Sequence, residues 1–245
     1  MLNEQTIDKL KALHLEAMCA SWLEQQNTPA TSSLSFDERL GLLVDAEWSS
    51  RENKRMTRNL KEAKLRISTA CIEGIDYPPR RELDKAVIRQ FASCRWVAEH
   101  QVIIITGATG TGKSYVGCAL AHQACRKGYR AMYRRAPRFF DELKLAHADG
   151  TYPRVLARIA RVDVLVIDDF AVAPMSDPER RDLLEVLEDR QELRATVITS
   201  QLDPKHWHDY LADPTLADAI CDRVQSRAHR LVLKGPSRRK EPVNQ

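Results

Sequence analysis

The sequence lacks a long apolar run. No stretch of its 245 residues approaches the roughly 20 consecutive apolar residues that a membrane-spanning helix needs. Its first residues, MLNEQTIDKLKALHLEAM, also lack a basic start followed by an unbroken apolar segment, the pattern of a secretory signal. We therefore expect a cytoplasmic protein and exclude one that spans a membrane.

Cysteines at metal-binding spacing are absent too. The six cysteines form no C-x-x-C pair, and no histidines accompany them at the spacing of a zinc finger. Structural zinc is therefore not expected. In a reducing compartment the cysteines are small, partly buried thiols, and none is nominated as a nucleophile.

Charge of one sign is not in large excess, but it is unevenly placed. The 38 Lys and Arg against 34 Asp and Glu give a net charge of +4, which argues neither for nor against nucleic acid. Residues 1–50 hold eight acids and three bases, whereas residues 51–66 hold seven bases and two acids. One short segment therefore concentrates the positive charge.

The first part of the chain has the periodicity of helices. Apolar residues recur at three- to four-residue spacing over 7–22 and 36–48, and Ser35 with Glu38 predicts a capping box. A basic amphipathic helix follows, with an apolar face that runs from Met56 to Ile67. Its opposite face is either solvated or a contact for nucleic-acid phosphates, and it carries Arg51, Lys54, Arg58 and Lys61.

After residue 101 the pattern becomes that of an α/β domain. Apolar, β-branched runs without alternation predict strands of a parallel sheet that is buried on both faces. These runs are 102–106, 130–133, 162–167, 195–200 and 229–233. We expect a helical N-terminal domain over 1–75, an α/β domain over 76–240 and a polar tail over 241–245.

A glycine-rich motif follows the first of these runs and precedes a helical segment. The segment Gly107-Ala108-Thr109-Gly110-Thr111-Gly112-Lys113-Ser114 matches G-x-x-x-x-G-K-[ST]. Its backbone N–H groups and the helix dipole form a nest for a polyphosphate. We expect Lys113 to neutralise the β- and γ-phosphates of ATP and Ser114 to bind Mg²⁺.

Two carboxylates end another buried run. Asp168 and Asp169 follow four apolar residues and lie at the edge of the sheet where α/β proteins bind ligands. Burying both would be costly without a cation. We expect Asp168 to hold Mg²⁺ and Asp169 to polarise the attacking water. From the end of 195–200, Thr199 or Ser200 could contact the γ-phosphate or that water.

At this point the sequence resembles a known family. The motifs GATGTGKS and VLVIDDF, the stretch TVITSQLDPKHWHDYLADPTLADAICDRVQSRAHRLVL and the closing GPSRRK are similar to the IstB-type transposition helper ATPases. These are relatives of DnaC helicase loaders and DnaA initiators in the AAA+ class. The resemblance implies a five-stranded AAA+ sheet preceded by a small helical domain.

The resemblance also implies further site residues. In a homo-oligomer with ATP at subunit interfaces, Arg223 would reach the neighbour's γ-phosphate, with Arg227 as the substitute. Tyr115 and the terminal Arg239 would lie near the nucleotide. The family's insertion would correspond to 136–160, and the neighbouring basic run, which contains Arg134, Arg135 and Arg138, would contact DNA phosphates.

Three functions are open. The first is an ATP-dependent helper that assembles on duplex DNA, bends it and recruits a partner transposase. The second is a DnaC-type helicase loader that acts on single-stranded DNA. The third is a small-molecule kinase, because a phosphate loop alone does not distinguish phosphorylation from hydrolysis. The sequence motif DPT-ADAI-DR and the basic helix favour the transposition helper.

Overall fold

The structure, a computed structural model, describes residues 2–238. The chain forms two compact units, which divide after Arg58 and are described separately. None of the helices in the described range combines the length and the apolar character that crossing a membrane would take.

The first unit is helical. It consists of α1 (Leu2–Ala12), α2 (Glu16–Asn27), the 3-10 helix η1 (Pro29–Ser33) and most of α3 (Phe36–Ala63). The predicted capping box of α3 is confirmed, since Glu38 accepts hydrogen bonds from the backbone N–H and the hydroxyl of Ser35, both at 2.8 Å. Glu47 of α3 accepts hydrogen bonds from the first-turn N–H groups of α2, which joins these two helices.

The basic face of α3 is confirmed. The four predicted bases on this face are exposed, whereas Met56 and Leu60 are half-buried and Ala63 is fully buried. The helix ends at Ala63 because Lys64 adopts the left-handed conformation, with φ of 52°. Ile67, which we had expected on the apolar face of the same helix, therefore lies beyond its end.

The second unit begins earlier than the boundary expected at residue 75. Ala63, Ala70 and Ile75 are buried in the same core cluster as Ile103 and Val164, which belong to the predicted strands 102–106 and 162–167. These apolar side chains explain why residues 59–75 belong with the α/β unit. The segment continues through η2 (Pro79–Arg81), α4 (Lys85–Ala92) and α5 (Arg95–Ala98).

The predicted parallel α/β sheet is confirmed. Its strands are β1 (Val102–Gly107), β2 (Ala131–Arg135), β3 (Val164–Phe170), β4 (Ala195–Ser200) and β5 (Ala228–Leu233). They lie in the order β2-β3-β4-β1-β5, and every neighbouring pair is parallel. Strand β4 separates β1 from β3. Its carboxyl end therefore lies between residues 107–114, called the phosphate loop below, and Asp168 with Asp169, called the acidic pair.

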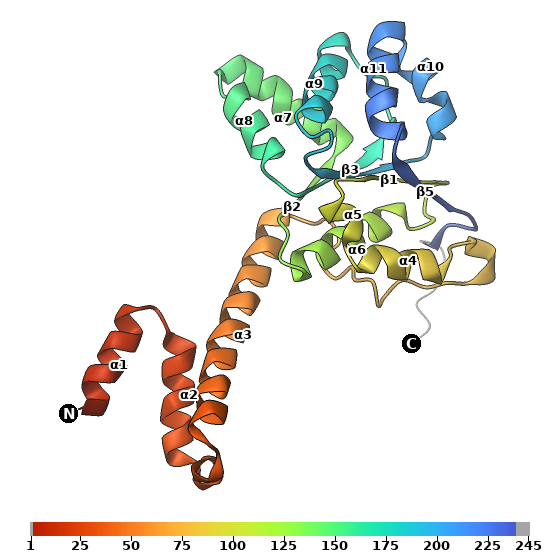
Figure 1. Ribbon diagram of the computed structural model, residues 1–245. Helices are drawn as coiled ribbons and strands as arrows, with labels where there is room; N and C mark the ends of the chain where they lie inside the picture. The colour runs from red at the N-terminus through yellow and green to blue at the C-terminus, as the bar shows by residue number, and fades with distance from the viewer. Residues whose placement is uncertain (1, 239–245) are drawn as a thin grey trace. The chain divides into compact units, whose positions relative to one another are not determined.

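Helices cover both faces of the sheet (Figure 1). One face is covered by α4, α5 and α6 (Lys113–Arg126), whose apolar residues share a core cluster with the sheet. The other face is covered by α7 (Ala136–Asp149), α8 (Tyr152–Ala160), α9 (Asp177–Glu188), η3 (Pro204–His206), α10 (Trp207–Leu211) and α11 (Pro214–Gln225). Residues 136–160, where the resemblance predicts an insertion, form α7 and α8.

The cysteines are all free. Burial raises the pKa of Cys94, Cys118 and Cys125 to about 11. These thiols therefore stay protonated at neutral pH and are weak nucleophiles.

Candidate nucleotide-binding site

The phosphate loop joins β1 to α6 in a conformation that requires glycine. Gly107, Gly110 and Gly112 have φ values of 148°, 85° and 94°. A Cβ on Gly107 would also lie 2.2 Å from the Leu233 carbonyl oxygen. The buried Lys113 donates hydrogen bonds from Nζ to the carbonyl oxygens of Gly107 and Ala108, at 2.8 and 2.9 Å. Its ammonium group is thereby held over the loop.

The two carboxylates of β3 face the same side because the strand is irregular there. Adjacent side chains of a regular strand point to opposite faces. Here the pairing of β3 with β4 shifts register between Ile167 and Phe170, and Asp169 has a φ of 58°. As a result Asp168 Oδ2 and Asp169 Oδ2 each lie 3.6 Å from Nη1 of Arg66.

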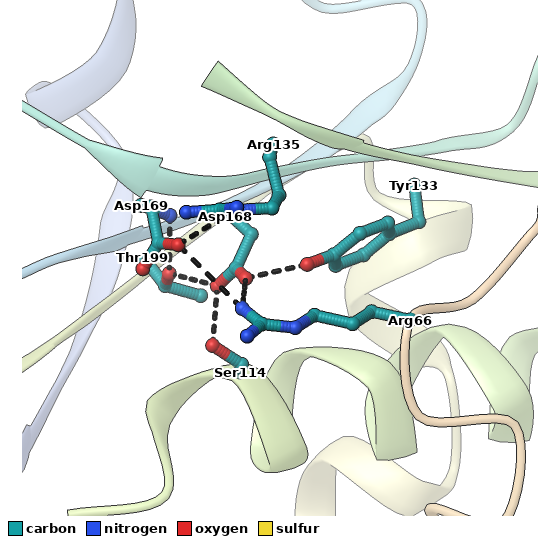
Figure 2. A network of polar contacts seen from close by, with 7 residues as sticks. All are labelled: Arg66, Ser114, Tyr133, Arg135, Asp168, Asp169 and Thr199. Carbon is teal, nitrogen blue, oxygen red and sulfur yellow. Dashed lines mark hydrogen bonds and ion pairs between the residues drawn. The ribbon is translucent and has the colours of Figure 1, made fainter. Parts of the chain in front are cut away.

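Asp168 is fully buried and is held by three hydroxyl groups (Figure 2). Ser114 and Thr199 donate to its Oδ1 at 2.9 and 2.5 Å, and Tyr133 donates to its Oδ2 at 2.5 Å. Burial and the hydrogen bond to Asp168 raise the pKa of Tyr133 far above its ordinary value, so this phenol stays a donor. Three donors compensate for much of the cost of burying the carboxylate.

The same group fits a magnesium ion. The Ser114 hydroxyl and the Asp168 carboxylate provide two oxygen atoms 2.9 Å apart at the end of the phosphate loop. Oxygen ligands of this kind, completed by nucleotide phosphates and water, suit Mg²⁺. Within residues 2–238 no group of three or more His, Cys, Asp or Glu could hold a metal by itself.

Two arginines approach the acidic pair. Arg66 reaches both carboxylates from the segment after α3, and Arg135, at the end of β2, donates from Nε to Asp169 Oδ2 at 2.9 Å (Figure 2). The pair thus faces two guanidinium groups from two different segments. Sequence reasoning missed Arg66, and it placed Arg135 among residues that contact DNA.

The two candidate hydroxyls at the end of β4 have different environments. Thr199 contacts both acids, since its Oγ1 donates to Asp168 and accepts from the Asp169 backbone N–H at 3.1 Å. Ser200 donates to the Phe170 carbonyl oxygen and accepts from the Leu202 N–H, which satisfies its hydroxyl away from the acids. Only Thr199 of the two lies beside the acidic pair.

A pocket of about 560 Å³ lies between the phosphate loop and the acidic pair. Besides loop residues its lining includes Arg66, Tyr115, Asp169, Gln201 and Arg238. Gln201 accepts a hydrogen bond of 2.9 Å from the hydroxyl of Thr109 and so connects the end of β4 to the loop. The predicted Tyr115 lines the pocket, whereas the predicted Arg239 lies outside the described residues.

Arg81 lies behind the loop and was not expected from the sequence. It is buried, and a Cβ on Gly112 would lie 2.8 Å from its Nη2. Its Nη1 donates to the Asp76 carbonyl oxygen at 2.7 Å, whereas Nε and Nη2 have no hydrogen-bond partner among residues 2–238. Burial and the nearby Arg238 lower its pKa. Arg81 therefore holds unused donors directly beneath Gly112.

The arginines expected to act on a neighbouring subunit lie elsewhere. Arg223 and Arg227 line a cavity of about 320 Å³ with Val102 and Thr196, which are at the amino ends of β1 and β4. Arg223 pairs with Glu188 at 2.6 Å. Both arginines are thus at the opposite edge of the sheet from the phosphate loop of their own chain.

The residues expected to contact DNA fall into three situations. Arg51 and Lys54 of α3 lie near Glu47 and Glu16, at 2.8 and 3.9 Å. Arg134 and Arg135 are paired with Glu142 and Asp169. The last group is exposed and has no ion pair within the described part of the chain, and it comprises Arg58, Lys61 and Arg138.

Sequence signals for the missed residues were weak. Arg66 is one of seven bases in a short basic segment, and nothing in its spacing distinguishes it. Tyr133 stands in an apolar strand, where an aromatic residue is ordinary. Gln201 follows Thr199 and Ser200 directly, so its place at the end of β4 could have been noted.

Comparisons with known structures identify the fold. The chain is similar to AMPPCP-bound DnaA from Aquifex aeolicus, with a TM-score of 0.59 and 18% identity over 70% of this chain and 51% of that one. It is also similar to the DnaC helicase loader, with a TM-score of 0.57 and 20% identity over 67% of this chain and 97% of that one. The α/β unit therefore has the AAA+ fold.

Comparisons of sequence identify the family. A protein named as an ATP-binding protein of insertion sequence IS1162, from Pseudomonas fluorescens, is 46% identical over 202 residues, which are 82% of this chain and 87% of that protein. The insertion-sequence ATP-binding protein y4pL of Sinorhizobium fredii is 41% identical over 240 residues, 98% of each chain. The family described as IstB-like ATP binding protein matches residues 8–245, and the chain belongs to this family.

Proposed function

We propose that this protein is an ATPase that assembles on duplex DNA in its ATP state, bends it, and recruits the transposase of its insertion sequence. The observation that carries the ATPase assignment is the contact of Ser114 and Thr199 with Asp168 beside the phosphate loop. The insertion-sequence names of the relatives support the role in transposition.

The phosphate loop binds the nucleotide. Backbone N–H groups of residues 107–114 and the N-terminus of α6 surround the β-phosphate, and Lys113 neutralises the β- and γ-phosphates. To do so its ammonium group exchanges its hydrogen bonds with Gly107 and Ala108 for phosphate oxygens. Ser114 and Asp168 would hold Mg²⁺, which would supply neutralisation of phosphate charge there.

Asp169 orients the attacking water. It lies at the pocket with Gln201, and its side chain is more exposed than that of the fully buried Asp168. Thr199 fixes the Asp168 carboxylate relative to the backbone of Asp169, because its Oγ1 contacts both. Hydrolysis then resets the assembly on DNA.

Assembly completes the site. Arg223 lies at the edge of the sheet opposite its own phosphate loop, so it can act only on the nucleotide of an adjacent copy. An arginine supplied in this way can raise the hydrolysis rate by about 10³–10⁵. ATP turnover therefore depends on oligomerisation, and Arg227 is the alternative finger.

Two variants test the division of roles. Lys113→Ala should lose nucleotide affinity, whereas Asp169→Asn should keep ATP binding and hold the protein on duplex DNA. The measurements are binding of a fluorescent ATP analogue and retention on labelled duplex. Equal loss of nucleotide binding in both variants would contradict the proposal.

The rival functions have their own tests. Competition between duplex and single-stranded DNA separates a transposition helper from a helicase loader, since the helper should prefer duplex. Phosphate release that duplex stimulates, without any small-molecule acceptor, excludes a kinase. Bending is tested by energy transfer between dyes at the two ends of a duplex, and a straight duplex in the saturated ATP complex would refute it.

A further inference from the structure

A second pocket, of about 520 Å³, lies on the β2 side of the acidic pair. Its lining includes six basic side chains from three parts of the second unit, namely Lys64, Arg66, Arg134, Arg135, Arg138 and Arg158. The segment after α3 contributes the first two, the end of β2 the next two, and α7 and α8 the last two.

The carboxylates nearby do not balance this charge. Glu142 pairs with both Arg134 and Arg158, and Asp168 and Asp169 face Arg66 and Arg135. Six cations thus face three carboxylates. Lys64 and Arg138 are exposed and form no ion pair with the described residues. Such a concentration of uncompensated charge favours an anion.

Arg66 belongs to both pockets. It lines the phosphate-loop pocket and the basic pocket, and its Nη1 is 3.6 Å from each carboxylate of the acidic pair. These separations are longer than a charge-assisted hydrogen bond, which is about 2.7–2.9 Å. Arg66 is therefore close enough to reduce the repulsion between the two carboxylates, but it forms no short hydrogen bond with either of them.

We propose that the basic pocket binds a phosphate of the nucleic-acid backbone, and that this phosphate competes with Asp168 and Asp169 for Arg66. The inference rests on the proposed function, because it assumes that the protein binds DNA. When the phosphate takes Arg66, Asp168 loses the cation that faces it and becomes available to Mg²⁺, whereas Arg135 stays paired with Asp169. DNA binding and ATP loading thereby become linked through one side chain.

The surroundings favour a backbone phosphate over a small anion. Arginine guanidinium groups present paired donors that match phosphate oxygens. Lys61, also exposed, precedes the pocket residue Lys64 by three positions, so the basic surface extends from the pocket onto α3. A polymer with many phosphates can use the pocket and this extension together.

The first experiment measures binding of labelled duplex in KCl titrations with Lys64→Ala/Arg138→Ala. Because the pocket holds one phosphate, its loss should reduce the slope of log affinity against log salt by about 0.9. The matched control, Lys127→Ala/Arg161→Ala, removes the same charges from the amino-terminal side of β2 and β3 and should keep the wild-type slope. Equal slopes for the two double variants would overturn the proposal that the basic pocket binds a backbone phosphate.

Two further outcomes separate the possible failures. If millimolar inorganic phosphate, at constant ionic strength, binds the wild type and not the pocket variant but leaves duplex affinity unchanged, the site takes small phosphate and the nucleic-acid assignment is wrong. If the wild type binds no duplex at all, the proposed function fails. If the wild type binds duplex and the pocket variant matches it, only this inference fails.

The second experiment tests Arg66 through nucleotide binding rather than turnover. Affinity for a fluorescent ATP analogue is measured with and without Mg²⁺, and with and without duplex. In the wild type, duplex should increase the gain in nucleotide affinity that Mg²⁺ causes by roughly fivefold or more. In Arg66→Ala and Arg66→Gln, Mg²⁺ should strengthen nucleotide binding to its full extent without duplex, so that duplex adds nothing to the effect of Mg²⁺. A wild-type response to duplex in both variants would overturn the competition.

Discussion

Thr199 donates a hydrogen bond of 2.5 Å to Asp168 and accepts one of 3.1 Å from the backbone N–H of Asp169. Replacing Thr199 by Val keeps the shape of the side chain but removes both bonds. We expect ATP binding to persist and turnover to fall by roughly 10- to 100-fold, as for other residues that orient a metal ligand. Steady-state phosphate release and binding of an ATP analogue measure the two effects.

The neighbouring Ser200 provides the control for that variant. Among residues 2–238 its hydroxyl bonds only to Phe170 and Leu202, so Ser200→Ala should lower the free energy of unfolding by about 1 kcal/mol and leave turnover intact. Turnover that falls more in Ser200→Ala than in Thr199→Val would reverse the roles given to these two residues.

A substitution of Tyr133 tests how much the hydrogen-bond donors around the buried Asp168 carboxylate contribute to stability. Tyr133→Phe removes the 2.5 Å hydrogen bond to Asp168 and leaves that oxygen with one donor fewer in a buried site. We expect the free energy of unfolding, measured in urea, to fall by about 1–3 kcal/mol. Tyr129→Phe is the matched control, because no hydrogen bond of its hydroxyl is found in the described structure, and it should change little.

The strands and the phosphate loop could be predicted from the sequence because their signals are local. Segment 195–200 was predicted with its exact ends, and the other four strands differ by one to three residues at an end.

Arg190 shows what local sequence signals do not predict. It stands in the polar segment Glu188-Asp189-Arg190-Gln191-Glu192, yet it is buried and donates to three backbone carbonyls, of Ile159, Val162 and Ala195.

The same reasoning applies to the candidate site. The motifs predicted Lys113, Ser114 and the acidic pair, because each motif contains its own chemistry. The contact of Arg66 with that pair joins residues about 100 positions apart and depends on where α3 ends. No pattern within either segment specifies such a contact.

The basic face of α3 should contribute unequally to duplex binding. Arg51 pairs with Glu47 at 2.8 Å, whereas Arg58 and Lys61 have no ion pair in the described structure. We expect Arg58→Ala/Lys61→Ala to reduce the salt slope by about 1.8, with similar effects on all duplex sequences. Arg51→Ala should reduce it by much less, because Glu47 already compensates that charge.

Fluorescence anisotropy over a KCl series measures these slopes. Arg55→Ala is the control, since Arg55 pairs with Glu52 at 2.8 Å on the same helix. If Arg58→Ala/Lys61→Ala leaves the slope at the wild-type value, the basic face of α3 is merely solvated.

Glu142 should make part of the stability depend on pH. Burial works to raise its pKa, but the hydrogen bonds and charges of Arg134 and Arg158 outweigh burial and hold the pKa below its ordinary value of 4.5. The folded chain therefore takes up the proton less readily than the unfolded chain. This contribution to the free energy of unfolding is complete above about pH 4.5 and is lost as the pH falls further, through the folded pKa.

A double-mutant cycle with Glu142→Gln and Arg134→Met isolates this effect. The coupling between the two residues, obtained from urea unfolding, should be constant from pH 7 to about pH 5 and should shrink as the pH is lowered below 4.5, because protonation removes the charge that Arg134 contacts at 2.8 Å. Other acids titrate in the same range, but their contributions cancel in the cycle. A coupling that keeps its neutral-pH value in acid would mean that Arg134 and Glu142 interact through packing and not through charge.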